Sequence, residues 1–188
     1  MLFHTDSAMR THYCSASVVR SAGHDLILTA GHCLGRNAAF VPRYDHTKSA
    51  AKQPYGIWPV KEWFRDKRYA SDKSVNSDLD FAFAALKTSG GRKIQDVVGA
   101  NTLDRTPGYK NKVTVIGYPA IRHNPGDQAF RCSDVRTTAL RGTTRCGSTA
   151  AACGAASPAG PSSPSSTPPA TPATSSATWG ASTAAART

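Results

Sequence analysis

A histidine in the stretch Leu-Thr-Ala-Gly-His-Cys-Leu, residues 28–34, is the first candidate for chemistry in this chain. The small residues before His32 leave its imidazole room to turn toward a partner, and Cys33 can anchor the loop from behind. Because the unperturbed pKa of a histidine lies near neutrality, an imidazole held in this way suits a general base. A lone loop histidine is more often structural, so the prediction depends on a second residue.

Asp80 is a suitable acid for such a histidine. It directly precedes the apolar run Phe-Ala-Phe at residues 81–83, so its carboxylate is expected where a loop meets a buried strand. There it can accept a hydrogen bond from one imidazole nitrogen and stabilise the imidazolium ion. Asp78 is the rival acid, although no apolar strand follows directly behind it. For either carboxylate alone, a surface turn is the simplest interpretation.

The cysteines indicate how the histidine loop is held. Cys14 and Cys33 lie at the outer ends of a predicted hairpin, where opposed strands can bring them within disulfide distance. The total of five cysteines is odd. Cys146 and Cys153 lack matching His or Cys spacing, so we expect no metal and no cofactor. The remaining histidines are expected at surface or turn positions: His4, His12, His24, His46 and His123.

Short strands are the elements that must position these residues. The run at 13–19, a turn at Gly23-His24 and the run at 25–29 predict a hairpin. Many turns and almost no 3.6-residue periodicity favour an all-β barrel or sandwich. Trp58, Trp63 and Phe64 are expected to pack in the core or between barrels. Further strands are predicted at residues 39–44, 57–64, 81–86, 97–98, 112–117 and 129–140.

Composition limits the possible functions. The 188 residues correspond to one domain, or to one domain with a tail. A formal charge of +11 could indicate a nucleic-acid partner, but the Lys and Arg residues are scattered, so a basic secreted protein is the better interpretation. No stretch is long and apolar enough to span a membrane. Residues 1–10 lack the apolar core of a signal peptide.

Several motifs together resemble the trypsin-like serine proteases of the chymotrypsin fold, in particular their bacterial secreted members. The resemblance covers about residues 2–142 and implies a double β-barrel with the active site in the cleft between the barrels. It also implies that His32 is the general base, that Asp80 orients it, and that Cys14–Cys33 is the histidine-loop disulfide. A protein or peptide substrate, a monomer and secretion are further expectations. The motifs are His-Tyr-Cys-Ser-Ala-Ser-Val-Val at 12–19, Thr-Ala-Gly-His-Cys at 29–33, Asp-Phe-Ala-Phe at 80–83 and Val-Thr-Val-Ile-Gly-Tyr-Pro at 113–119.

The nucleophile of that family is missing. Its serine lies in a Gly-x-Ser-Gly-Gly type motif, and no serine after Gly142 is followed by two glycines. The glycine whose N–H helps to form the oxyanion hole is absent as well. We therefore expect an inactive chain, with a truncated protease domain at 1–142 and an incomplete second barrel. The alternative is a non-catalytic module with a Pro/Ser/Thr stalk that binds a protein or polyanion through its basic surface.

Residues 143–188 form a Pro/Ser/Thr/Ala-rich tail, predicted to be disordered because it has almost nothing to bury. The tail uses only Ala, Cys, Gly, Pro, Arg, Ser, Thr and Trp. These eight types are the ones whose codons carry C or G in the middle position. In a GC-rich genome it is the third codon base that is almost always C or G. In the tail the middle codon base is C or G throughout, as a third base would be, and this is typical of DNA translated in the wrong frame.

A shifted reading frame can be tested on the sequence itself. When each codon is rebuilt from the last base of one codon and the first two bases of the next, residues 148–152 permit Val-Asp-Cys-Gly-Gly. Residues 155–161 permit Gly-Gly-Val-Ser-Gly-Gly-Pro in the same way. The displaced nucleophile would fall at Pro158 and the displaced cysteine at Ala150, a family-like partner for Cys132. On this hypothesis Cys146 and Cys153 are by-products, and Cys132 lacks its proper partner.

Overall fold

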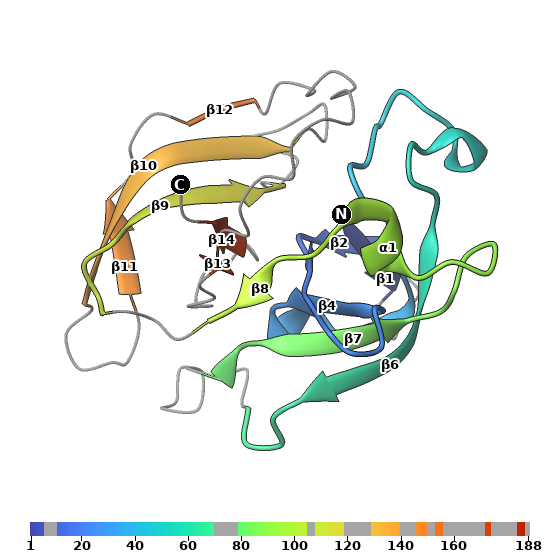
Figure 1. The fold of residues 1–188 in the computed structure, drawn as a ribbon, viewed down its shortest axis with the longest axis horizontal. Coiled ribbons are helices and arrows are strands. Elements are labelled where there is room, and N and C mark those ends of the chain that lie inside the picture. Colours follow the sequence, from blue (N-terminus) through green and yellow to red (C-terminus); the bar gives the residue numbers. More distant parts are fainter. Residues whose placement is uncertain are drawn as a thin grey trace.

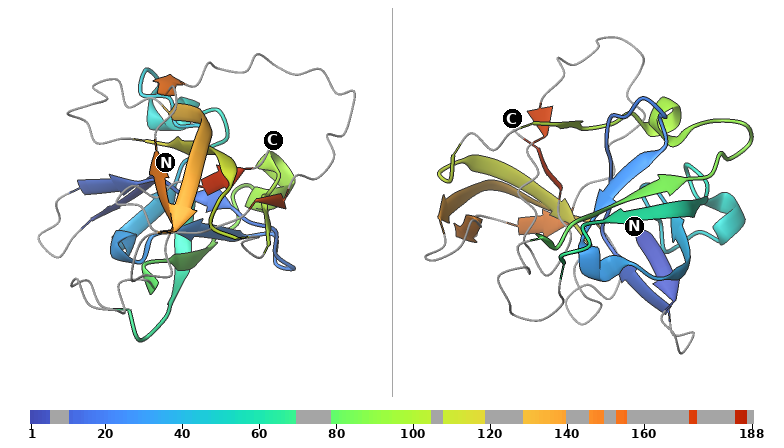
Figure 2. Two further views of the ribbon diagram at one scale, coloured as in Figure 1. Left: turned by 90° about the vertical axis from the view of Figure 1, so that its left-hand side faces the viewer. Right: turned by 90° about the horizontal axis from the view of Figure 1, so that it is seen from below.

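A computed structural model describes residues 1–5, 11–69, 79–104, 108–118, 129–139, 146–149, 153–155, 172–173 and 184–186. These residues form two β-sheets, with short helices in the connections (Figure 1). The first sheet lies on one side of the ribbon diagram and the second on the other, and the right-hand view of Figure 2 shows the same separation. The expected all-β class is confirmed, with short helices only in the described connections.

The first sheet has seven strands in the order β2-β1-β5-β6-β7-β4-β3. Its two edge strands, β2 and β3, are separated along the chain only by Ser15 and Ala16, so the sheet curves round until its edges meet at this bend. The strands are β1 (Leu2–Thr5), β2 (Thr11–Cys14), β3 (Ser17–Val18), β4 (Leu26–Thr29), β5 (Arg36–Phe40), β6 (Trp58–Arg65) and β7 (Ala82–Leu86).

Strand pairing in the first sheet brings the two chemical stretches together. The predicted hairpin is present as β3 and β4, with Val18 opposite Ile27. On its other side β4 pairs antiparallel with β7, and Thr29 at the end of β4 lies opposite Ala82 at the start of β7. The residues that follow β4 and those that precede β7 therefore meet at the same end of this strand pair.

The core lies against the first sheet. Strand β7 alternates between buried and half-buried residues, as expected of a strand with one face on the core. Trp58 is 1% exposed, and Trp63 packs against the same cluster, which confirms the expectation for both. The expectation for Phe64 is wrong: it is 45% exposed, because it follows Trp63 on the opposite face of β6.

The second sheet is built around an antiparallel pair, β9 (Lys112–Gly117) and β10 (Phe130–Ala139). Strand β9 has the predicted bounds, and β10 lies within the strand predicted at 129–140. Register shifts between Cys132 and Val135 mark a bulge in this pair. The remaining strands are β8 (Thr102–Leu103), β11 (Cys146–Thr149), β12 (Cys153–Ala155), β13 (Pro172–Ala173) and β14 (Ala184–Ala186). The last four lie within residues 143–188.

The connection between the two sheets contains α1 (Ile94–Val98), although a strand was predicted at 97–98. Gly99, with φ +74°, ends this helix. The backbone N–H of Gln95 donates to His24 O (3.0 Å), and its side-chain Oε1 accepts from Ser21 N–H (3.0 Å). The sequence pattern gives little sign of so short a helix, because its stability comes from these contacts and from buried Ile94.

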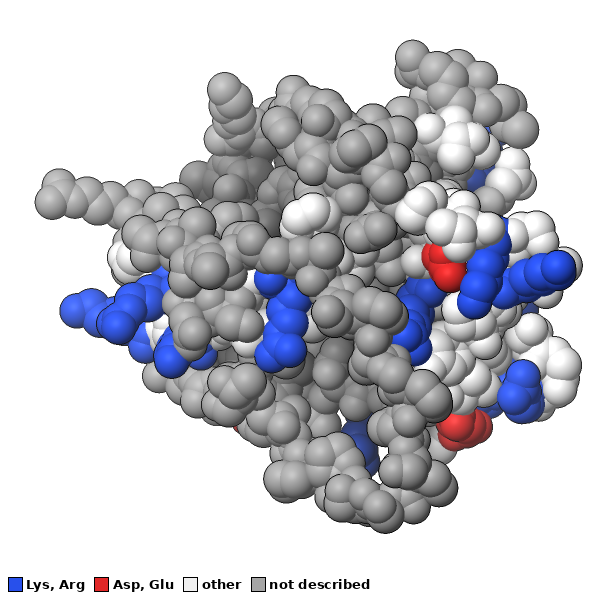
Figure 3. Space-filling view, turned by 90° about the horizontal axis from the view of Figure 1, so that it is seen from above, with Lys and Arg blue, Asp and Glu red and all other residues white. Residues whose placement is uncertain are grey.

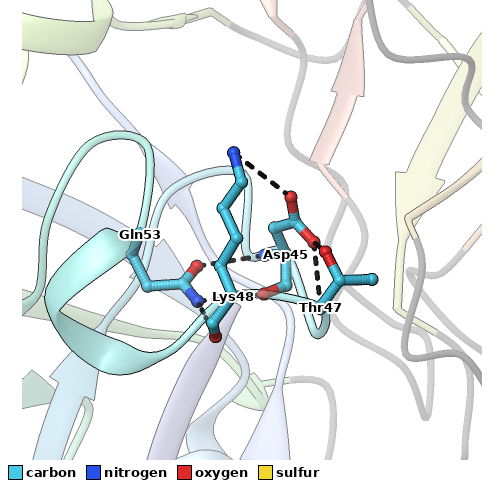
Figure 4. Close-up of polar contacts among 4 residues, drawn as sticks. All are labelled: Asp45, Thr47, Lys48 and Gln53. Atoms are coloured by element: carbon cyan, nitrogen blue, oxygen red, sulfur yellow. Dashed lines mark hydrogen bonds and ion pairs between the residues drawn. The ribbon is translucent and has the colours of Figure 1, made fainter.

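A loop between β5 and β6 is organised by one buried side chain (Figure 4). Gln53 donates through Nε2 to the carbonyl oxygens of Asp45 (2.9 Å) and Lys48 (3.0 Å), and its Oε1 accepts from Asp45 N–H (3.0 Å). Thr47 donates from its hydroxyl and its N–H to the Asp45 carboxylate. The pKa of Asp45 is lowered, first by the Thr47 side chain.

The charge distribution of the described surface matches the scatter of Lys and Arg in the sequence. Figure 3 shows basic side chains in several separate groups over one face, with few acidic ones. Among the residues that the structure describes, no helix has the length and apolar character needed to cross a membrane.

Candidate active site

His32 lies on a single 3-10 turn, η1 (Gly31–Cys33), directly after β4. Ala30 and Cys33 on either side of the imidazole are buried, at 4% and 0% exposed, while the His32 side chain is 39% exposed. The Cys14–Cys33 disulfide joins the turn to the end of β2. The backbone of the histidine is thus held from both sides, while its ring can be reached from solvent.

Asp80 binds His32 at two points. Its Oδ1 accepts the backbone N–H of His32 (2.8 Å), and its Oδ2 lies 2.7 Å from the imidazole Nδ1. The Asp80 side chain is 17% exposed, so the pair is partly shielded from water. A carboxylate only accepts hydrogen bonds, so the proton of the neutral imidazole lies on Nδ1 and its Nε2 carries a free lone pair. This is the tautomer that a general base requires.

Gly31 explains how the turn comes so close to the acid. A Cβ at this position would lie 3.1 Å from Asp80 Oδ1, 3.4 Å from Phe81 N and 3.5 Å from Arg65 Cδ. The absence of a side chain at residue 31 therefore eases the close approach of the histidine turn to Asp80, since a Cβ would be tight against Oδ1. Antiparallel pairing of β4 with β7 supplies the approach, and Gly31 permits its last step.

Comparison with known protein families identifies the family of this chain. A family model described as Trypsin matches residues 2–158. The chain belongs to the trypsin family. The match extends beyond residue 142, where the protease domain was predicted to end. A search of curated protein sequences finds no match to this chain.

Solved structures show the same family fold. The protease Anisep from Arthrobacter nicotinovorans is 30% identical with a TM-score of 0.63, over 75% of this chain and 64% of that one. A thermostable serine protease, AL20, from an extremophilic microorganism is 24% identical with a TM-score of 0.61, over 98% of this chain and 88% of that one. A Glu endopeptidase in complex with MPD is 17% identical with a TM-score of 0.55, over 74% and 62%. This trypsin-family chain thus spans less than two thirds of the Arthrobacter protease.

The family's serine has no equivalent among the described residues. Ser89 is followed by Gly90 and Gly91, but it lies in a tight turn in which its backbone pairs with Arg92. Asp80 precedes the start of β7 and Ser89 follows its end. The five residues of the strand span roughly 15 Å at about 3.3 Å per residue, so the two side chains are far apart. Ser89 is therefore not the nucleophile of the trypsin-family site. Asp78, Ala150 and Pro158 lie outside the described residues.

Cys132 is disulfide-bonded, and the register of β10 with β12 places Cys153 directly opposite it. The frameshift hypothesis expects the proper partner of Cys132 at the position of Ala150, which lies outside the described residues, so that part stays a prediction. The sequence does not predict the observed register, because it depends on two short strands. Cys14, His32 and Cys33 also lie together, but sulfurs joined in a disulfide are not thiolate ligands for a metal.

The other histidines occupy several environments. His24 forms a turn and pairs with Asp96 through Nδ1 and Oδ1 (2.6 Å), and His46 is exposed, as expected. The expectation for His4 is wrong: it is 8% exposed on β1, because it faces the backbone of Gly35. The side chain of His12 and all of His123 lie outside the described part of the chain.

Sequence reasoning missed two residues near the site, Tyr69 and Arg65. The guanidinium carbon of Arg65 lies 5.2 Å from the centroid of the Tyr69 ring, and Arg65 Cδ lies beside Gly31 of the histidine turn. The pKa of the Tyr69 phenol is raised, first by burial and then by the charge of Asp80. No motif indicates this cluster, because it forms only when the turn after β6 folds back toward η1.

Proposed function

We propose that the chain derives from a serine endopeptidase that cleaves proteins or peptides, with His32 as general base and Asp80 as the residue that orients it. The observation that supports this most strongly is the double contact of Asp80 with His32, at 2.8 Å to the backbone N–H and 2.7 Å to Nδ1. Family membership supports the reaction class. A binding module has no need of this alignment.

The chemistry assigned to His32 follows from its free Nε2. In a complete site, Nε2 takes the proton of the serine hydroxyl as the serine oxygen bonds to the substrate carbonyl carbon. The same proton then passes to the leaving amine as the C–N bond breaks. Asp80 stays ionised and stabilises the imidazolium that exists between these two steps.

As written, the chain is proposed to be inactive. It contains no serine in a Gly-x-Ser-Gly-Gly motif, and the glycine N–H of the oxyanion hole is missing with it. We attribute both losses to a shifted reading frame after about residue 142, so that residues 143–188 are not the family's own sequence. The disulfide Cys14–Cys33 also favours an oxidising compartment, which supports secretion.

The DNA sequence of the locus tests the frameshift. It should be determined from the codon of Leu140 past the stop codon. If one base gained or lost restores a serine codon at Pro158 within Gly-Gly-x-Ser-Gly-Gly, the frameshift is supported. If the same DNA encodes the Pro/Ser/Thr tail and no serine motif overlaps it, the chain is a pseudoprotease with a stalk. Steeply salt-dependent binding to heparin or DNA would then favour the binding-module alternative.

A peptidase assay on the frame-restored protein tests the two site residues. Asp80→Asn is expected to lower kcat by about 10⁴-fold, because the imidazole loses the partner that fixes its tautomer. His32→Ala should be at least as damaging. The matched control is Asp96→Asn, since His24 and Asp96 form an equally short pair (2.6 Å) on another part of the surface. Equal effects of both Asn variants would disprove the assignment.

A further inference from the structure

We propose that Ser15 is a positioning residue, whose hydroxyl fixes the end of β9 in the second sheet relative to the turn that carries His32. This inference rests on the proposed function, because the base and the nucleophile of that reaction would lie on different sheets. His32 follows β4 of the first sheet, and the displaced serine is expected at position 158, in the chain after β10 of the second sheet. The reaction therefore requires a fixed relative position of the two sheets.

Ser15 is fixed to the histidine turn of the first sheet. It lies at the bend between β2 and β3 and is 7% exposed. Its neighbour Cys14 forms the disulfide with Cys33, the residue directly after His32. Its carbonyl oxygen accepts a hydrogen bond from Thr29 Oγ1 (2.9 Å), at the end of the strand that leads into the turn. The backbone of Ser15 is thus connected to the histidine turn at two points.

The hydroxyl of Ser15 contacts the other sheet. Its Oγ accepts the backbone N–H of Tyr118 (2.8 Å), although the two residues are 103 positions apart. Tyr118 directly follows β9, and the residue before it, Gly117, pairs with Phe130 of β10. A partly buried N–H needs an acceptor, so this bond stabilises one placement of the β9–β10 pair against the first sheet.

A cavity beside the bend explains why a directional bond matters at this place. It has a volume of about 530 Å³ and is lined by Ala16, Val18 and Phe40 from the first sheet and by Ile116 and Tyr118 at the end of β9. Close packing of side chains fixes the relative position of elements in a core, but side chains on the two sides of a cavity do not interlock. A hydrogen bond restricts distance and direction, so it can fix a position where packing does not.

A second connection between the sheets depends less on a hydroxyl. The chain passes from the first sheet toward the second through Asn101 and β8 (Figure 1). Asn101 Nδ2 donates to Ser17 Oγ (2.7 Å), but its backbone also donates to Val18 O (2.9 Å) and accepts from Arg20 N–H (2.9 Å). Ser17→Ala would remove the first of these bonds and leave the two backbone bonds in place. It is therefore the matched control for Ser15→Ala.

The first measurement is amide hydrogen exchange in the chain as it exists. Ser15→Ala should raise the exchange rate of the Tyr118 amide by about five- to tenfold, as expected for the loss of one hydrogen bond, and leave the amides of β7 unchanged. Ser17→Ala should leave the Tyr118 amide unchanged. A Tyr118 rate that Ser15→Ala does not alter would overturn the inference and leave the proposed function intact. A rise of equal size in β7 would also overturn it, because it would show a loss of overall stability.

The low-field proton resonance of His32 Nδ1–H separates the two proposals. It should be present in the unmodified chain and in Ser15→Ala, because Asp80 holds the imidazole in both, and it should be lost in Asp80→Asn. Its absence from the unmodified chain would remove the His32–Asp80 pair, and the proposed function with it. Its loss in Ser15→Ala would show that the hydroxyl acts on the pair itself, and would overturn the assigned role in placing β9.

The second measurement is the steady-state kinetics of the frame-restored protein. Ser15→Ala should lower kcat by up to about 100-fold with little change in KM, because a misplacement of about 1 Å between base and nucleophile slows the reaction to this extent. Ser17→Ala should leave kcat close to that of the restored parent. An unchanged kcat in Ser15→Ala, or an equal loss in both variants, would overturn the positioning role.

Discussion

Gly31 is the residue at which the closeness of the site can be tested most directly. In Gly31→Ala the new methyl group would meet Asp80 Oδ1 at 3.1 Å and the Phe81 backbone at 3.4 Å. The tight contact is with Asp80 Oδ1, which cannot move aside without lengthening its hydrogen bond from the His32 backbone N–H. We expect a loss of about 1–2 kcal/mol in unfolding free energy, typical of overpacking. Urea unfolding and the His32 Nδ1–H resonance measure the two effects.

An alanine at position 31 that leaves both stability and the resonance unchanged would show that the turn has room to spare. In that case the close approach of the turn to Asp80 is not a constraint on residue 31. The disulfide Cys14–Cys33 should form in the variant as it does in the parent chain, since it lies on the other side of His32 from Gly31. Its presence controls for general misfolding.

Single residues differ in how far the sequence alone predicts them. His32 and Asp80 stand in stretches whose local pattern has a chemical meaning, and the structure brings the two side chains together. Their catalytic roles remain predictions. Arg65 and Tyr69 have no such local pattern, because their contact depends on the turn after β6. Phe64 was predicted wrongly for a related reason: the face of β6 on which it lies decides its exposure.

At the scale of elements, the Cys14–Cys33 disulfide is expected to be the strongest single constraint on the histidine turn. It closes a loop with a sequence separation of 19. Replacing both cysteines by alanine should cost about 3 kcal/mol, because the unfolded chain regains the entropy of that loop. Thermal or urea unfolding of the oxidised parent and the double variant measures this cost.

Reduction of the parent chain supplies the control for that comparison. Cys132 is disulfide-bonded too, so the reduced parent loses both bridges, whereas the double variant retains the second one. A double variant as stable as the oxidised parent would contradict the expected role of the Cys14–Cys33 bridge. A variant as unstable as the reduced parent would assign the whole effect to this bridge.

Elements were predicted best where the local pattern and the tertiary fold agree. The hairpin of β3 and β4, the buried strand β7 and the alternating strand β9 all follow from apolar spacing. Strand β1 was not predicted, since Leu2–Thr5 carries too short a pattern to signal a strand. Helix α1 was mistaken for a strand because two adjacent valines favour strands, while its contacts with the β3–β4 turn lie far away in sequence.

At the scale of the whole molecule, the amino group of Met1 makes stability depend on pH. It is buried and donates to Val41 O (2.7 Å), and burial lowers its pKa to about 5. An unfolded chain holds this proton up to about pH 8. Between pH 5 and 8 the unfolded state therefore binds more protons, so folding stability rises with pH across this window. The difference is on the order of 4 kcal/mol.

An Nα-acetylated chain isolates this effect, because it lacks the titrating amino group. Urea unfolding of the free and acetylated chains should give free energies of unfolding that diverge as the pH falls from 8 to 5. The free chain becomes the less stable one as the pH falls. Parallel curves would mean that the amino group is solvated in the folded state.

The last prediction concerns the unequal stability of the two sheets. The buried core cluster consists of residues from the first sheet and its connections, together with Ile94 of α1. Among the residues of β8, β9 and β10 whose burial the structure describes, Thr114 and Val135 are the buried ones, and Ile116 is 43% exposed. Amide hydrogen exchange should therefore be slowest in β4 and β7 and faster in β9 and β10. One cooperative transition with uniform protection would contradict this expectation. Restoring the reading frame should slow exchange in β9 and β10 alone, because the family's own sequence would then cover them.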